Sequence, residues 1–152
     1  MKIFITVGTT LFDELIRNVD SVAEELEGFN FTFQISKGKY KPKNGTYFDF
    51  VQNIDEYYND ADLVITHSGA GSIYRLLELN KKIIVVPNID RVDKHQTDIS
   101  TYMSENNHVL LLSDFKYTKD VILDAEFFLP KVFIKKHFFL KDEIVDFIKE
   151  QV

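Results

Sequence analysis

Three short loops hold the residues of this chain that could do chemistry. They are Gly8-Thr9-Thr10, the segment His67-Ser68-Gly69-Ala70-Gly71-Ser72, and the segment Asn88 through Gln96. Glycine lets a backbone approach a ligand closely, and the free N–H groups at the start of a helix favour an anion. A phosphate or a diphosphate is therefore the expected ligand, with Ser72 as a further hydroxyl donor. The alternative is that these glycines only form tight turns, because short glycine-rich turns between strands and helices are common.

Each of these loops follows a segment that the sequence predicts to be a buried strand. Lys2–Val7, Leu63–Thr66 and Lys82–Pro87 are short apolar runs, which are typical of strands covered on both faces. Between them, apolar residues recur at helical spacing over residues 11 to 26, with Thr10 as the expected N-cap. The remaining expected elements are strands at 29–36, 46–51 and 109–112, and helices at 54–59, 72–79, 95–105 and 117–126.

This alternation predicts an α/β fold with a doubly wound, Rossmann-like parallel sheet. The 152 residues, of which 45% are hydrophobic, suffice for one domain that spans residues 1–152. In an open parallel sheet, ligands bind beyond the carboxyl ends of the strands, which is where the three loops fall. A closing helix is indicated by the spacing of Leu140, Ile144, Val145 and Ile148.

The composition argues against several classes of protein. The chain has no cysteine, so it has no disulfide frame, no thiolate nucleophile and no cysteine-ligated metal. Its formal net charge of -6 disfavours binding to nucleic acid. No apolar run reaches the roughly 18 to 20 residues that a membrane-spanning helix needs. We therefore expect a cytoplasmic protein whose contact with a membrane is peripheral or made through a partner.

Other nucleotide-binding motifs and other chemistries fit less well. The chain lacks the phosphate-binding pattern G-x-x-x-x-G-K-[ST]. Gly69-Ala70-Gly71 begins a dinucleotide-binding pattern, but Tyr74 occupies the position of the third glycine, which argues against an NAD-linked enzyme. Ser68, His95 and Asp98 could be arranged as a hydrolase triad, yet the G-x-S-x-G elbow is missing. The acidic residues near the third loop match no metal-binding loop, so we expect no metal there: Asp90, Asp93 and Asp98.

Two further features keep alternative interpretations open. His67 and His95 each lie in a predicted strand-end loop and could donate to a phosphate or a sugar hydroxyl, although a single histidine is more often structural than catalytic. The segment Val132–Leu140 mixes phenylalanine with lysine and could contact a membrane surface or a partner subunit. A final helix that packs its rings on the sheet explains the same segment equally well.

Four segments, taken in order, resemble a known family. They are IFITVGTTLFDELI (Ile3–Ile16), ADLVITHSGAGSI (Ala61–Ile73), KKIIVVPN (Lys81–Asn88) and DKHQTDIS (Asp93–Ser100). Together they resemble the donor-binding subunits of two-component glycosyltransferases, which are related to the C-terminal domain of glycosyltransferase family 28. Members include bacterial polysaccharide-biosynthesis subunits and the eukaryotic subunit that adds N-acetylglucosamine to a dolichol-linked oligosaccharide.

The resemblance implies one half of a GT-B glycosyltransferase. This chain would bind a UDP-sugar as substrate, with no cofactor. A membrane-anchored partner subunit would bind a lipid-linked saccharide as acceptor. The implied reaction is an inverting, metal-independent hexosyl transfer in polysaccharide biosynthesis, which the chain would perform only together with that partner.

The resemblance also assigns residues to the site. The diphosphate would contact two glycine loops, formed by Gly8, Thr9 and Thr10 and by Ser68, Gly69, Ala70, Gly71 and Ser72. Phe50 and Val51 would flank the uracil. The sugar hydroxyls would contact Asn88, His95 and Gln96. His67 is the candidate for the catalytic base.

Arg75 departs from the pattern of the family, which usually has an acidic residue here to hold the ribose hydroxyls. A guanidinium has only donors and cannot accept those hydrogen bonds. The alternative hypothesis is therefore a non-catalytic nucleotide-binding or regulatory module that has lost donor binding at Arg75.

Overall fold

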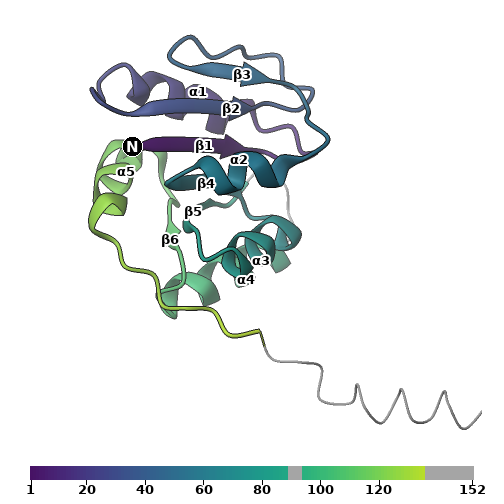
Figure 1. The fold of residues 1–152 in the computed structure, drawn as a ribbon, viewed down its shortest axis with the longest axis vertical. Helices are drawn as coiled ribbons and strands as arrows, with labels where there is room; N and C mark the ends of the chain where they lie inside the picture. Colours follow the sequence, from purple (N-terminus) through teal and green to yellow (C-terminus); the bar gives the residue numbers. More distant parts are fainter. Residues whose placement is uncertain (89–93, 136–152) are drawn as a thin grey trace, which may run out of the picture.

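The computed structural model describes residues 1–88 and 94–135, and for residues 94–97 it describes the backbone alone. The described residues form a parallel sheet of six strands in the order β3-β2-β1-β4-β5-β6 (Figure 1). The strands are β1 Lys2–Thr6, β2 Asn30–Gln34, β3 Thr46–Phe48, β4 Leu63–His67, β5 Lys82–Val86 and β6 Leu110–Leu111. The helices are α1 Asp13–Ala23, α2 Ile54–Asp60, α3 Ala70–Glu78, α4 Lys94–Glu105 and α5 Thr118–Phe127, with a 3-10 turn at Phe115–Tyr117.

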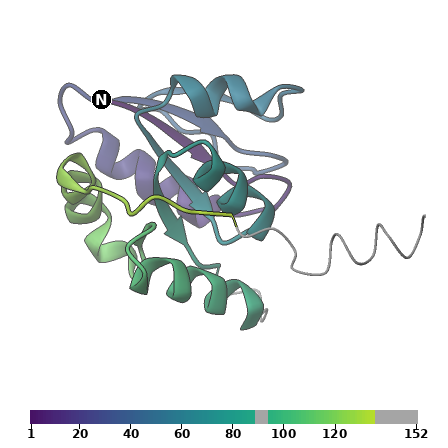
Figure 2. The same ribbon diagram turned by 60° about the horizontal axis from the view of Figure 1, so that its bottom comes forward.

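Helices cover both faces of the sheet. Successive residues of a strand point to opposite faces, so one strand contributes side chains to two cores. On one face, Ile3 and Ile5 of β1 belong to a core that also holds Leu15 of α1 and Ile122 of α5. On the other face, Phe4 of the same strand belongs to a second core, to which α2, α3 and α4 contribute Tyr58, Ile73, Leu76, Leu77 and Met103. Figures 1 and 2 show these two groups of helices on opposite sides of the sheet. The predicted doubly wound α/β architecture is therefore confirmed.

The order of the strands reverses next to β1. Strand β1 pairs with β2 on one side and with β4 on the other, so Thr6 lies between Gln34 and Thr66 in register. In sheets of this kind, the connections leave to opposite faces at such a reversal, and a crevice opens beyond the carboxyl ends of the two strands. The loops that follow β1 and β4 are the two glycine loops of the sequence analysis.

Several predicted boundaries are wrong by a few residues, for reasons of tertiary structure. Helix α1 begins at Asp13, and its N-cap position is Phe12 rather than Thr10. The side chain of Asp13 instead accepts hydrogen bonds from the backbone N–H groups of Lys39 and Tyr40, at 3.0 and 3.3 Å. Helix α3 begins two residues earlier than expected, at Ala70. Strand β3 ends at Phe48, so Phe50 and Val51 lie beyond it.

The described residues include only part of the C-terminal segment for which the sequence analysis made predictions. Residues 132–135 are not helical, and Phe133 packs its ring against Tyr74 and His108. The predicted closing helix and residues 136–140 lie outside the described residues. No helix in the described part of the chain is long and apolar enough to cross a membrane.

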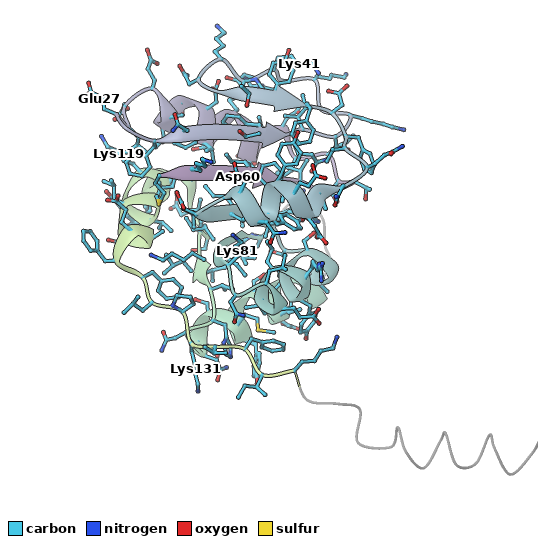
Figure 3. All side chains as sticks on the ribbon, in the orientation of Figure 1. Glu27, Lys41, Asp60, Lys81, Lys119 and Lys131 are labelled. Atoms are coloured by element: carbon cyan, nitrogen blue, oxygen red, sulfur yellow. The ribbon has the colours of Figure 1, made fainter. Side chains whose placement is uncertain are left out.

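The lysine-rich loop between β2 and β3 is fastened to α1 by a buried carboxylate. Asp20 is 1% exposed and accepts hydrogen bonds from the Tyr40 hydroxyl at 2.6 Å and from the N–H groups of Lys43 and Asn44 at 2.8 to 3.0 Å. Its carboxylate therefore binds the backbone of the loop rather than a lysine side chain. Lys41 lies at the surface (Figure 3), where its Nζ is 3.2 Å from Asp49 Oδ1. Burial opposes the ionisation of Asp20, but the hydrogen bonds from Tyr40, Asn44 and Lys43 outweigh it and lower the pKa of Asp20.

Replacing Asp20 by asparagine should therefore destabilise the protein by about 1 to 3 kcal/mol at neutral pH, because the loop donors lose a charged acceptor. Since the folded pKa lies below the unfolded one, this stabilisation is present above the unfolded pKa and is lost as the pH falls through the folded pKa. Urea unfolding of the wild type and of Asp20→Asn at pH 7 and near pH 3 should show the difference shrinking in acid. The exposed Asp124→Asn, on α5, is the control, with an expected change within about 0.5 kcal/mol. A difference between wild type and Asp20→Asn that does not change with pH would contradict this account.

Candidate functional site

The two glycine loops meet around the imidazole of His67. The structure places His67 as the last residue of β4, where it is 7% exposed, rather than in a loop. A Cβ atom added at Gly8 would lie 2.9 Å from His67 Cε1, and one added at Gly69 would come still closer to His67 Nε2. Gly8 also has a φ of 58°, which favours glycine. The ring therefore fills the space between the two loops, and both positions are restricted to glycine by contact with it.

The start of α3 presents unused N–H groups at the carboxyl edge of the sheet. The first hydrogen bond of this helix runs from Ile73 N–H to Gly69 C=O, at 3.0 Å. The preceding N–H groups have no acceptor within the helix, and two of the residues that carry them, Ala70 and Gly71, are exposed. None of the described side chains caps the helix, and its first turn carries no acidic residue. Because a helix start carries a partial positive charge, this geometry suits an anion.

Buried hydroxyls surround this helix start. Ser68 and Thr66 are fully buried, and neither Ser68 Oγ nor Thr66 Oγ1 has a hydrogen-bond partner among the described residues. The Ser72 side chain is hydrogen-bonded to Tyr58 of α2, which also bonds Thr6 of β1. Burial raises the pKa of the Tyr58 hydroxyl, while its hydrogen bonds to Ser72 and Thr6 act in the opposite direction. The hydroxyl that the sequence offered to a phosphate thus has a protein partner when no ligand is bound.

Two residues that the sequence analysis did not single out build this edge. Tyr58 is 3% exposed and joins α2, β1 and α3 through its hydroxyl. Gln34, the last residue of β2, is 1% exposed and makes hydrogen bonds to Thr6, Gly8 and Asp49. The sequence signal that could have identified Gln34 is its place at the end of a strand predicted to be buried, where an unpaired amide is unfavourable.

The other predicted site residues are distributed around the same edge. Thr9 is exposed, Thr10 is half-buried, and Asn88, just after β5, is buried at 9% exposure. Phe50 is 69% exposed, and Val51 is half-buried. His95 and Gln96 belong to the first turn of α4, but their side chains lie outside the described ones, as do Asp90 and Asp93. The described residues that directly follow β1, β4 and β5 therefore lie at the carboxyl edge of the parallel sheet.

A cavity of about 600 Å³ opens near the carboxyl edge of the sheet, but the glycine loops do not line it. Its described lining comes from the start of α1, the ends of β5 and β6 and the segment that follows: Phe12, Glu14, Val86, Pro87, Leu112, Ser113, Asp114 and Phe115. None of the predicted site residues is in that lining, and Glu14 and Asp114 give it negative charge. An anionic ligand is therefore better matched to the start of α3 than to this cavity. Among the residues that the structure describes, no cluster of three or more histidine and acidic side chains could hold a metal ion.

Arg75 faces a carboxylate of the neighbouring helix. Its Nε donates to Asp55 Oδ1 at 3.1 Å, and its Nη2 pairs with Asp55 Oδ2. Glu78 lies on the other side, with 4.0 Å between Arg75 Nη1 and Glu78 Oε2. The hydrogen bond from Arg75 lowers the pKa of Asp55. The charge of the unexpected arginine is thus matched by a carboxylate of α2.

The doubly wound parallel sheet defines a Rossmann-like domain. Residues 2–122 match the glycosyltransferase family 28 C-terminal domain, and the chain belongs to this family. The resemblance stated from the sequence motifs is therefore confirmed.

Known relatives agree with this assignment. The chain is 34% identical over 119 residues to the human "UDP-N-acetylglucosamine transferase subunit ALG13", a match that covers 70% of this chain and 10% of that protein. It is 32% identical over 77 residues to the "UDP-N-acetylglucosamine--N-acetylmuramyl-(pentapeptide) pyrophosphoryl-undecaprenol N-acetylglucosamine transferase" of Parabacteroides distasonis, which covers 51% of this chain and 21% of that enzyme. The crystal structure of MurG from Acinetobacter baumannii superposes with a TM-score of 0.69 at 18% identity, over 82% of this chain and 41% of that chain. The chain thus spans only a small part of the length of these relatives.

The contact between Gly69 and His67 gives a direct test of the site geometry. Gly69→Ala should destabilise the protein by about 1 to 3 kcal/mol, because its Cβ collides with the imidazole. His67→Ala should remove most of that effect, so the double variant should be more stable than the two single changes predict. Gly71→Ala is the matched control, because a Cβ there meets nothing within 4 Å. Equal effects of Gly69→Ala and Gly71→Ala on the midpoint of thermal unfolding would refute the packing of the ring against Gly69.

Proposed function

We propose that this chain is the donor-binding subunit of an inverting, metal-independent hexosyltransferase. It binds a UDP-sugar and acts together with a membrane-anchored subunit that binds a lipid-linked saccharide. The observation that carries the proposal is the start of α3: exposed N–H groups without a cap or an acidic neighbour, next to a second glycine loop, in a family 28 domain. The protein itself is cytoplasmic and peripheral to the membrane through its partner, and its role is in polysaccharide biosynthesis.

The chemistry required of such a site is the stabilisation of a leaving diphosphate. An acceptor hydroxyl oxygen attacks the anomeric carbon from the face opposite the UDP. The bond from that carbon to the phosphate oxygen breaks, and UDP leaves with the electron pair. Backbone N–H groups and the dipole of α3 stabilise the charge that develops on the diphosphate without a metal ion. His67 is the candidate that accepts the proton of the acceptor hydroxyl.

The names of two relatives support the remaining parts of the proposal. The human relative is called a transferase subunit, which supports action with a partner. The name of the P. distasonis relative includes a pyrophosphoryl-undecaprenol group, which supports a lipid-linked acceptor. Both names include UDP-N-acetylglucosamine, which supports a UDP-sugar as donor.

The second candidate is a regulatory module that has lost donor binding, and Arg75 is the observation that favours it. Replacing Arg75 by glutamate would restore an acid but would also set it against Asp55, whose carboxylate now pairs with the guanidinium. Arg75→Gln is therefore the cleaner variant, because it removes the charge without adding repulsion. If the regulatory hypothesis holds, the wild type with its partner transfers no sugar, and Arg75→Glu or Arg75→Gln strengthens UDP-sugar binding.

Gly71 allows fold stability and ligand binding to be separated. An aspartate there replaces a helical glycine and places a negative charge in the first turn of α3, so it should leave the stability unchanged or raise it by about 0.3 to 1 kcal/mol. The same charge should repel a diphosphate, so titration calorimetry with UDP should show at least about tenfold weaker binding than in the wild type. Gly71→Asn is the control for size, since it adds a similar volume without the charge.

The wild-type chain, titrated with its partner present, should bind UDP and a UDP-sugar with dissociation constants in the range of about 1 μM to 1 mM. No binding of UDP or of any UDP-sugar would overturn the proposed function. Binding that Gly71→Asp leaves unchanged would show instead that the diphosphate does not lie at the start of α3.

A further inference from the structure

Gln34 has a buried side-chain amide whose hydrogen-bonding capacity is fully used. Its Oε1 accepts from Thr6 Oγ1 at 2.6 Å and from the N–H of Gly8 at 3.1 Å. Its Nε2 donates to the carbonyl of Gly8 at 2.7 Å and to the carbonyl of Asp49 at 3.1 Å. Two acceptor sites and two donor hydrogens are all that a glutamine amide offers here. All of these partners lie at the carboxyl edge of the sheet.

These hydrogen bonds fix the loop after β1. Because both the N–H and the C=O of Gly8 bind Gln34, the peptide groups on both sides of this residue are held in orientation. Gly8 in turn contacts the ring of His67, and Thr9 and Thr10 follow it directly. The position of this glycine loop is thus determined by the side chain of a neighbouring strand.

The bond to Asp49 fixes a second segment. Asp49 comes directly before Phe50 and Val51, which lie past the end of β3. The backbone pairing of β2 with β1 and β3 does not depend on the Gln34 side chain, because it uses main-chain groups. The amide therefore orders the loops beyond the strands rather than the strands themselves.

We propose that Gln34 is a positioning residue that joins two walls of the donor site, Gly8–Thr10 and Asp49–Val51, into one unit. The inference rests on the proposed function and on the expectation from the family resemblance that the first wall contacts the diphosphate and the second contacts the uracil. In this arrangement Gln34 contacts neither the diphosphate nor the base. It sets the distance between the two walls, so that a nucleoside diphosphate engages both at once without prior ordering of the loops.

The test is titration calorimetry of the full chain with UDP, with the partner subunit present, for the wild type and for variants of this hydrogen-bond cluster. Gln34→Leu should weaken UDP binding by about 10- to 100-fold, as expected when a binding loop is misplaced. Thr6→Val keeps the shape of the strand residue but removes one hydroxyl of the cluster, and it should weaken binding less, in the same direction. Asp20→Asn is the matched control: it loosens a buried hydrogen-bonded carboxylate outside the site, and it should leave UDP binding within about twofold while lowering the thermal midpoint.

The second readout is the coupling between Gln34 and Phe50 in UDP binding. A purely structural role of Gln34 would not produce this coupling. In the wild type, Phe50→Ala should weaken UDP binding, whereas in Gln34→Leu the same change should have a clearly smaller effect, because the second wall is already displaced. Additive effects of Gln34→Leu and Phe50→Ala would overturn the positioning role of Gln34 but not the proposed function. UDP affinity within twofold of the wild type in both Gln34→Leu and Thr6→Val would do the same. If the wild type binds no UDP, the proposed function fails, and the role of Gln34 fails with it.

Discussion

The packing of one imidazole ring between two glycines is the constraint on which the geometry of this edge depends. His67 ends the strand that lies beside β1, so its side chain is placed by the sheet and not by a loop. A Cβ atom at Gly8 or at Gly69 would meet the ring, so a larger residue at either position requires the ring to move. The ring therefore acts as a planar spacer between the two glycine loops. Gln34 then fixes the orientation of the loop after β1.

Much of this fold could be predicted from the sequence, because its central strands are buried on both faces. The segment Ile83–Val86 is continuously apolar, and a short run of this kind between two polar turns is typical of a covered parallel strand. Helix boundaries were less predictable where tertiary contacts compete with local preferences. Asp13 shows this clearly. It follows the expected N-cap Thr10 by three residues, which is the spacing of a capping box. The structure instead uses its carboxylate for the backbone of a loop that lies 26 residues further along. Local sequence does not encode that competition.

The candidate site shows the same division. Its glycine loops could be predicted, because strand–glycine–helix sequences are local signals and parallel strands end at one edge. Gln34 and Tyr58 could not, because their roles depend on contacts that are distant in sequence. The hydrogen bonds of Gln34 reach residues 15 to 28 positions away, and the Tyr58 hydroxyl lies near side chains of two other elements. A similar point applies to Arg75. In the sequence it is an unexpected cation near a phosphate-binding loop, but in the structure its charge is paired with Asp55, so its effect on a ligand depends on that pair.

Electrostatics also explains why one helix start, and not another, should hold an anion in an acidic chain. The net charge of -6 repels a diphosphate at long range, so a local field must outweigh that repulsion. The first turn of α1 carries Asp13 and Glu14, and that of α2 carries Asp55 and Glu56, which cancel the partial charge of each helix start. The first turn of α3 carries no acidic residue and consists of Ala70, Gly71 and Ser72. Of these three helices, α3 is the one that keeps its positive end available. Helix α4 also carries no acidic residue in its first turn, so charge alone does not single out α3. The position of α3 does: it follows β4 at the switch point between β1 and β4, where ligands bind in folds of this class.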